Sequence, residues 1–264
     1  ARIAAGLQHS HIVPVFSFGE DQQRFYYVMQ IIEGVGLDRL IDRWAAGEMA
    51  VSIENLIAEF HPPGESRQSS PTNQGRILRR DSWQQLGKIA AQVTSAIRYA
   101  HKQGTLHRDI KPANLLIDIK GKTWIADFGL AMARDQAMEA NTESLAGTIR
   151  YMAPEQFAGI SDVRTDLYAF GVTLYELATL RPPFVGETKE KLIATIREGK
   201  PPRPRSVNPE IPVSLETIIL KAMAVDPQKR YQNADQLHAD LLSFLNAGKS
   251  KSRQSLWRSI RKWF

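Results

Sequence analysis

The sequence predicts an α+β fold in which a β-hairpin comes first and helices follow. Residues 13–18 and 24–32 are apolar or alternate with polar residues, and the turn-forming residues 19–21 separate them, as in a hairpin. A helix is predicted from Ser82, its N-cap, because apolar residues then recur every three to four positions. A second helix is predicted over residues 166–180, which are mostly apolar. With 264 residues and 43% hydrophobic content, the chain can bury one large core or a domain and a half.

The segment between residues 45 and 81 interrupts this pattern. Residues 61–75 are rich in Pro, Ser, Gly and other polar residues, so they cannot bury enough apolar surface to offset the entropy of ordering them. We therefore expect an irregular insertion over residues 45–81, in which residues 61–75 are disordered at the surface. It is either a docking element or additional length that the fold tolerates.

A second, shorter hairpin is predicted in the middle of the chain. Residues 115–117 and 123–126 are short apolar strands that flank Gly121. The two ends of this hairpin would hold Asn114 and Asp127 near each other. Rigid strands can position polar side chains for chemistry, so a functional site is expected there.

Three motifs occur in a fixed order around this second hairpin. His107-Arg108-Asp109-Ile110-Lys111-Pro112-Ala113-Asn114 precedes it, Asp127-Phe128-Gly129 follows it, and Ala153-Pro154-Glu155 comes later. Phosphoryl transfer needs a carboxylate to take the hydroxyl proton, ligands for Mg²⁺ and a cation near the moving group, and the motifs contain all three. Their order and spacing resemble the eukaryotic-type (Hanks-type) serine/threonine protein kinases of the kind found in bacteria.

The resemblance covers roughly residues 1–247 and implies a two-lobed protein kinase fold with a mostly helical large lobe. Asp109 would then be the catalytic carboxylate that accepts the substrate's hydroxyl proton, and Asn114 and Asp127 would be the Mg²⁺ ligands. Lys111 would place its charge against the γ-phosphate of ATP. Together, Lys111 and Thr148 resemble the serine/threonine branch of the family.

The same resemblance assigns the nucleotide-binding hinge. Met29 would be the gatekeeper beside the adenine of ATP, and the backbone from Gln30 to Ile32 would hydrogen-bond the adenine. Residues 1–33 would then be the remainder of the small lobe and the hinge, and residues 34–247 the large lobe.

Three further residues receive structural roles from the resemblance. Asp166 would brace the backbone of the catalytic loop. Glu155 would form an ion pair with Arg230, and removing one partner of such a pair, if buried, would cost about 3–5 kcal/mol. His107 is expected to be a packed structural histidine and not a base.

Residues 127–155 correspond to the activation segment of the family. Residues 141–144 within it are polar and contain the hydroxyl groups of Thr142 and Ser144. Arg108, which directly precedes Asp109, would be the cationic partner of a phosphate on this segment. Thr142 best matches the regulatory position and Ser144 is second; alternatively, both hydroxyls are simply solvated.

Two motifs of the family have no counterpart in these 264 residues: the Gly-rich phosphate loop, and a strand lysine paired with a helix glutamate. We therefore expect a kinase domain whose small lobe is truncated, beginning after its first three strands. The expected function is transfer of the ATP γ-phosphoryl group to Ser or Thr of protein substrates, with ATP and Mg²⁺ as cofactors. The alternative is a non-catalytic kinase-like scaffold tethered by its tail.

The C-terminal residues 248–264 differ in composition from the rest of the chain. Six Lys and Arg residues and no acid lie there, which accounts for the whole net charge of +6, so the basic balance does not predict nucleic-acid binding by the fold. Helical periodicity would put Leu256, Trp257 and Ile260 on one side. The segment is expected to be either an interfacial helix at a membrane surface or a linker to a further domain. A cytoplasmic location is expected, with any membrane anchor outside this chain, because no apolar run approaches the ~18–20 residues of a transmembrane helix.

Overall fold

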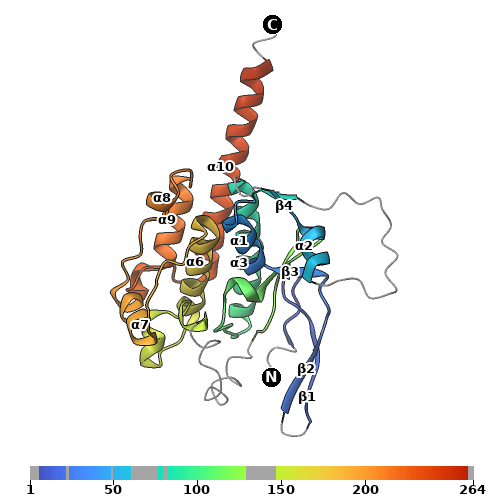
Figure 1. The fold of residues 1–264 in the computed structure, drawn as a ribbon, viewed down its shortest axis with the longest axis vertical. Coiled ribbons are helices and arrows are strands. Elements are labelled where there is room, and N and C mark those ends of the chain that lie inside the picture. Colours follow the sequence, from blue (N-terminus) through green and yellow to red (C-terminus); the bar gives the residue numbers. More distant parts are fainter. Residues whose placement is uncertain are drawn as a thin grey trace, which may run out of the picture.

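The computed structural model describes residues 6–21, 24–48, 50–60, 77–79, 82–128 and 147–260. Only the backbone is described for residues 24, 25, 54, 58, 60, 77–79 and 248–260. Residues 1–5, which belong to the predicted remainder of the small lobe, lie outside this range. A long hairpin projects from one end of the molecule and helices form the bulk of the other, which confirms the predicted α+β fold class (Figure 1).

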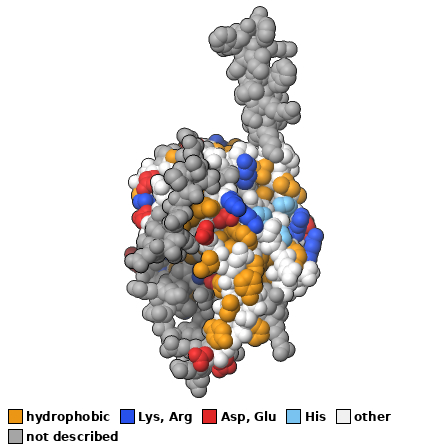
Figure 2. Space-filling model, turned by 90° about the vertical axis from the view of Figure 1, so that its right-hand side faces the viewer, with side chains coloured by type: hydrophobic (Ala, Val, Ile, Leu, Met, Phe, Trp, Pro, Cys, Tyr) orange, Lys and Arg blue, Asp and Glu red, His pale blue; other side chains and the backbone are white. Residues whose placement is uncertain are grey.

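The projecting hairpin consists of β1 (Val15–Asp21) and β2 (Arg24–Met29), which pair antiparallel. Asp21 lies opposite Arg24, so residues 19–21 belong to the strand and are not the predicted turn. β2 ends at Met29, three residues before the predicted end of the strand. Hydrophobic side chains remain exposed on the hairpin, and Figure 2 shows them gathered on the lower part of the molecule; they are Phe16, Phe18, Tyr26 and Val28.

A three-stranded antiparallel sheet has the order β3-β6-β7, with β3 at Gly34–Gly36, β6 at Leu115–Asp118 and β7 at Thr123–Ile125. β6 and β7 are the predicted second hairpin, which is confirmed. Ile12 forms a parallel bridge with Ile125, so the N-terminal segment is joined to this sheet. The Ala126 N–H donates to the Asn114 carbonyl at 2.9 Å, which closes the hairpin beside both predicted metal ligands.

Four short elements follow β3: α1 (Leu37–Ala45), β4 (Ala50–Ser52), α2 (Ile53–Phe60) and β5 (Ile77–Arg79). The expectation of an irregular segment over residues 45–81 is therefore wrong for residues 50–60 and 77–79. Val51, Ile53 and Leu56 are buried, so these residues gain enough apolar contact to order the backbone. Residues 61–76, the Pro- and Ser-rich part, lie outside the described residues.

Helix α3 (Trp83–Lys102) begins directly after Ser82, as predicted, although the Ser82 side chain makes no capping hydrogen bond. It packs against α10 (Ala234–Ile260). At the crossing a Cβ on Gly87 would lie 2.7 Å from the ring of Phe244, so a larger residue there would separate the two helices.

Helix α6 (Val163–Thr179) is the most buried helix of the described chain. It begins three residues before the predicted start because Asp162 caps it, accepting from the Arg164 N–H at 2.7 Å. It packs against α9 (Val213–Ala222). Further helical elements among the described residues are α7 (Lys189–Glu198), α8 (Pro204–Val207) and the 3₁₀ turns η2 (Pro112–Asn114), η3 (Pro154–Ala158) and η4 (Pro227–Lys229).

Helix α10 is one continuous 27-residue helix, so the start of the predicted basic tail continues the last helix without a break. Its C-terminal part projects beyond the rest of the molecule in Figure 1. Within the described ranges, none of the helices combines the length and the apolar character needed to cross a membrane.

Candidate active site

In the predicted catalytic loop, residues 107–114, Lys111 contacts two other predicted site residues, Asp109 and Thr148. The Lys111 ammonium group donates to Asp109 Oδ2 at 2.9 Å and to Thr148 Oγ1 at 3.0 Å. Asp109 is only 7% exposed, so its carboxylate depends on the lysine charge and on nearby donors. A proton acceptor, a cation and a hydroxyl group therefore meet at one point.

Asn114, at the end of η2, is oriented by Asp109. Its Nδ2 donates to the Asp109 carbonyl at 2.7 Å and to Asp109 Oδ2 at 3.1 Å. Because the amide nitrogen is engaged in this way, Oδ1 is the atom that Asn114 can offer to a metal ion.

Asp127 begins the Asp-Phe-Gly motif two residues after the end of β7. Its backbone is left-handed, with φ of 63°, a conformation that costs a non-glycine residue about 1–3 kcal/mol. Such strain occurs where the surrounding structure fixes a side chain for function. Asp127 also lines a small cavity together with Met29 of β2 and Phe128.

The oxygen atoms of Asn114 and Asp127 fit Mg²⁺. This ion prefers hard oxygen ligands and is held by one or two protein groups together with phosphate oxygens and water. Among the described residues, no group of three or more His, Cys, Asp or Glu forms an all-protein metal cage.

His107 is fully buried and neutral. Its Nε2 lies 2.8 Å from the Ala126 carbonyl and must carry the proton, while Nδ1 accepts from the Asp109 N–H at 3.2 Å. Burial lowers the pKa of His107, and the Asp166 carboxylate only partly offsets this. The ring also packs edge-on against Phe128, with 4.5 Å between ring centres. These contacts give His107 a packing role between two motifs.

Asp166, in the first turn of α6, holds the backbone before Asp109. Its Oδ2 accepts from the His107 N–H and its Oδ1 from the Arg108 N–H, both at 2.8 Å. Arg108 has φ of 68°, so these bonds fix another left-handed residue. Burial opposes ionisation of Asp166, but hydrogen bonds from His101 and His107 outweigh burial and lower its pKa.

Sequence reasoning missed His101. Its Nε2 donates to Asp166 Oδ2 at 2.8 Å, so the last turn of α3 is tied to α6 beneath the catalytic loop. A histidine at the end of an amphipathic helix, just before the motif, was the available signal. It was not decisive, because a helix-terminal histidine is also favoured by the helix dipole.

The predicted hinge follows β2. The Gln30 N–H donates to the Pro14 carbonyl at 2.9 Å, which ties the hinge to the start of the hairpin. Met29 is partly exposed and lines the same cavity as Asp127, so the gatekeeper position and the metal-ligand position face a common space. Ile32 lies two residues after Gln30 and outside any strand.

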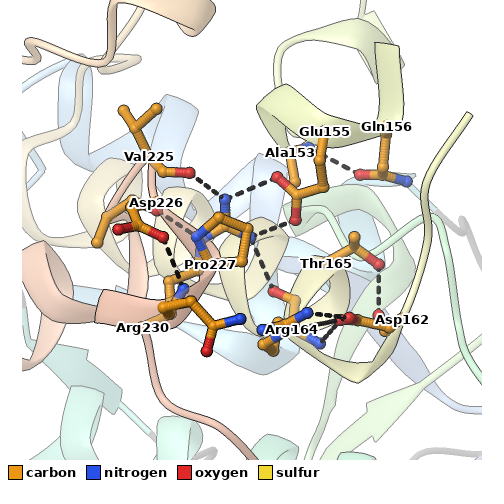
Figure 3. A network of polar contacts seen from close by, with 12 residues as sticks. Ala153, Glu155, Gln156, Asp162, Arg164, Thr165, Val225, Asp226, Pro227 and Arg230 are labelled. Carbon is orange, nitrogen blue, oxygen red and sulfur yellow. Dashed lines mark hydrogen bonds and ion pairs between the residues drawn. The ribbon is translucent and has the colours of Figure 1, made fainter. Parts of the chain in front are cut away.

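Glu155 and Arg230 form a two-pronged ion pair, drawn in Figure 3, with Nη1 to Oε1 at 2.6 Å and Nη2 to Oε2 at 2.8 Å. The Arg230 residue is 2% exposed, and its guanidinium also donates to the carbonyls of Ala224, Val225 and Arg164. Its charge and its N–H groups are therefore satisfied inside the protein.

A second polar contact beside Thr148 was also missed. The Tyr151 hydroxyl donates to Glu176 Oε2 of α6 at 2.5 Å. Burial raises the pKa of Glu176, while the hydrogen bond from Tyr151 and then the charge of Arg150 oppose that rise. The nearby carboxylates of α1, Asp38 and Asp42, raise it further. Neither residue belongs to a motif that predicts the contact, because 25 residues separate the two in the sequence.

The predicted regulatory residues Thr142 and Ser144 lie outside the described residues. Arg108, their predicted phosphate partner, is described and half-buried.

The fold of the chain and the geometry of the site agree with what a comparison with known protein families shows. The chain belongs to the protein kinase domain family, whose model matches residues 1–242. It is 32% identical over 255 residues to the serine/threonine-protein kinase PrkC of Bacillus subtilis, covering 96% of this chain and 34% of that protein. It is also 32% identical over 248 residues to the serine/threonine-protein kinase PknB of Mycobacterium leprae, covering 92% of this chain and 34% of that protein.

The chain thus spans about a third of the length of these relatives. Among solved structures, the kinase domain of Mycobacterium tuberculosis PknI is similar, with a TM-score of 0.61 and 23% identity, over 92% of this chain and 75% of that one. This likeness supports the predicted kinase fold.

Proposed function

We propose that this chain carries the catalytic machinery that transfers the γ-phosphoryl group of ATP to Ser or Thr hydroxyls of protein substrates. The observation that carries the proposal is the contact of Lys111 with both Asp109 and Thr148. It joins a proton acceptor to a cation at the position where charge moves during phosphoryl transfer. The relatives named above are serine/threonine kinases, and none of them favours the non-catalytic scaffold.

In this proposal Asp109 orients the substrate hydroxyl and accepts its proton. Its position is preorganised, because Asn114 and Lys111 donate to the carboxylate and Asp166 holds the preceding backbone. Lys111 would balance the negative charge of the γ-phosphate as that group moves.

Asn114 Oδ1 and the Asp127 carboxylate would hold Mg²⁺, which supplies positive charge to the ATP phosphates when bound. The backbone of Gln30 and Ile32 would bind the adenine, and Met29 would limit the depth of its pocket. Met29 and Asp127 line one small cavity of about 10 Å³, which supports their being neighbours in this site.

The proposal is tested by two substitutions in the full-length protein. Asp109→Asn should lower kcat by about 10²–10⁴-fold while ATP affinity changes little, because the general base is lost but the metal ligands remain. Asp127→Asn should weaken Mg²⁺-dependent nucleotide binding as well. Radiolabelled phosphate transfer and nucleotide-binding calorimetry give the two readouts.

Asp235→Asn on the exposed side of α10 is the matched control, because it makes the same chemical change far from the site. It should leave both readouts unchanged. Full activity of Asp109→Asn would remove Asp109 from the mechanism and with it this function.

We also propose a contact for the C-terminal segment, either with an anionic membrane surface or, as a linker, with a further domain. Its six cations without an acid and the helical backbone up to Ile260 support both readings. Co-sedimentation with anionic lipid vesicles separates them, since a linker alone would not sediment.

A further inference from the structure

Segment 8–13, the stretch of chain that leads into β1, is held against two other parts of the fold. The Ile125 N–H donates to the His11 carbonyl at 2.8 Å, and the Val13 N–H donates to the Ile125 carbonyl at 2.9 Å. On the other side of the segment, the His9 ring stacks against α3. The segment therefore joins a helix to the sheet just before the β1–β2 hairpin begins.

His9 makes a hydrogen bond that only the neutral imidazole allows. The His11 N–H donates to His9 Nδ1 at 3.1 Å, so Nδ1 carries no proton. His9 Nε2 then carries the proton and lies 3.3 Å from Ser95 Oγ, and the ring stacks on Tyr99 with 5.3 Å between ring centres. A proton on Nδ1 would place two N–H groups against each other, and the bond to His11 would be lost.

His11 keeps its own ring hydrogen bond in either protonation state. Its Nδ1 lies 2.8 Å from the Thr123 carbonyl, so this atom carries the proton in the neutral ring. An imidazolium keeps that N–H, and the bond survives. The rings of His9 and His11 are 5.6 Å apart, so positive charges on both would repel each other. His9 is thus the residue whose protonation removes a contact.

Burial is the main reason why His9 is neutral. Burial lowers the pKa of His9, and the positive charges of His11, Arg98 and Lys122 lower it further. Arg98 of α3 also lies 3.6 Å from Asp235 of α10, so its charge is partly balanced. The direction of the shift therefore follows from the half-buried position of the ring and not from an excess of cations.

The β6–β7 turn faces His11 with one charge of each sign. Burial lowers the pKa of His11, and the hydrogen bond to Thr123 opposes this; Lys122 lowers the pKa further, whereas Asp118 raises it. Asp118 would thus accommodate a positive charge on His11. The charged groups that act on His9 are cations.

The same segment forms part of the small cavity at the candidate active site. Ile12 and Val13 line this cavity together with Asp127 and Phe128. Ile12 also forms its parallel bridge with Ile125, two residues before Asp127. A displacement of the segment would therefore change one wall of the cavity.

We propose that segment 8–13 is a pH-sensitive latch, which is closed while His9 Nδ1 accepts the His11 N–H and is released when His9 is protonated. The closed form binds one proton fewer than the released form. The latch is therefore complete above about pH 6.5, the ordinary pKa of histidine, and is lost as the pH falls below it. The proposal does not rest on the proposed function, because the latch is measured without nucleotide.

The test is hydrogen–deuterium exchange of the full-length protein between pH 5 and 8, followed by mass spectrometry of fragments that span segment 8–13. After correction for the intrinsic pH dependence of exchange, the protection of the segment should fall about three- to tenfold from pH 7 to pH 5. Fragments of α6 should stay protected over the same range, which distinguishes release of the latch from global unfolding.

Two substitutions of His9 should fix the segment in opposite states. His9→Gln should stay protected at pH 5, because the Gln side-chain oxygen can accept the His11 N–H and does not titrate. His9→Phe keeps a ring against Tyr99 but has no acceptor, so its protection should be low at every pH. His238→Gln is the matched control, since it removes another half-buried histidine, where α10 meets α3, and should respond to pH like the parent.

The proposal is overturned if the protection of the parent does not change with pH, or if His9→Gln loses protection as the parent does. It is also overturned if His238→Gln abolishes the response, or if α6 loses protection together with the segment. Should the His9 variants fail to fold, exchange of the imidazole C2 hydrogen in the parent gives the pKa of His9. A protection loss centred away from that pKa would then contradict the latch.

Discussion

The catalytic loop and the β1–β2 hairpin are stabilised in opposite ways. Around the catalytic loop, polar side chains are buried and paired within the chain, as Arg230 and Asp166 show. On the hairpin and just after it, apolar side chains are open to solvent, with Phe16 67% and Ile31 83% exposed.

Because of this difference, the residues proposed for the chemistry and the hairpin beside the proposed nucleotide site should differ in rigidity. The groups that would handle the proton and the metal are fixed by contacts between distant segments, so their geometry is preorganised. The hairpin is held mainly by the hydrogen bonds between its two strands, and an isolated two-stranded hairpin is only marginally stable in water. We therefore expect the hairpin to open at lower free energy than the catalytic loop.

The largest effect should come from the buried ion pair. Arg230→Ala should lower the free energy of unfolding by about 3–5 kcal/mol, because Glu155 would keep a partly buried charge without its partner. Chemical denaturation of the domain measures the change.

Lys200→Ala is the control for this variant, since Lys200 pairs with Glu198 on the surface, where solvent screens both charges. Its unfolding midpoint should stay close to that of the parent. A similar loss in both variants would mean that burial does not distinguish the two ion pairs.

A smaller effect on stability is expected from the buried, neutral His107. The folded-state pKa of His107 lies below its ordinary value of 6.5, so the unfolded chain binds the proton more readily. The stability that His107 contributes is therefore complete above about pH 6.5 and is lost as the pH falls below it. The slope for one linked proton is at most about 1.4 kcal/mol per pH unit.

His107→Gln should reduce this slope by up to about 1.4 kcal/mol per pH unit, the contribution of one linked proton. The slope is obtained from the free energy of unfolding measured at several pH values between 5 and 8. Burial also lowers the pKa of His238, but that side chain is only partly buried, so His238→Gln should reduce the slope less. The explanation fails if the two variants titrate alike.

The smallest effect is expected on the hairpin. Phe18→Ser should change the free energy of unfolding by less than about 0.5 kcal/mol, because Phe18 is 43% exposed. Phe170→Ser in buried α6 should instead cost at least about 3 kcal/mol. If Phe18→Ser is as costly as Phe170→Ser in the full-length protein, another segment covers the hairpin there.

Much of the fold could be predicted because its signals are local. The hairpin of residues 115–117 and 123–126 and the helix after Ser82 follow from periodicity over a few residues, and both were found. The element boundaries were less accurate, since residues 19–21 extend β1 and Asp162 starts α6 early. Strand pairing and capping decided those boundaries, and neither is visible in periodicity alone.

The sequence by itself determined the residue types of the site and their order, from Asp109 through Asn114 to Asp127, because that chemistry needs particular side chains at short spacings. The tertiary structure alone decided which distant groups support them. His101 reaches Asp166 across 65 residues, and Tyr151 reaches Glu176 across 25. Residues 50–60 are ordered for the same reason, since Val51, Ile53 and Leu56 gain their burial from packing. Such contacts depend on how helices and strands pack, and short-range sequence patterns do not encode that packing.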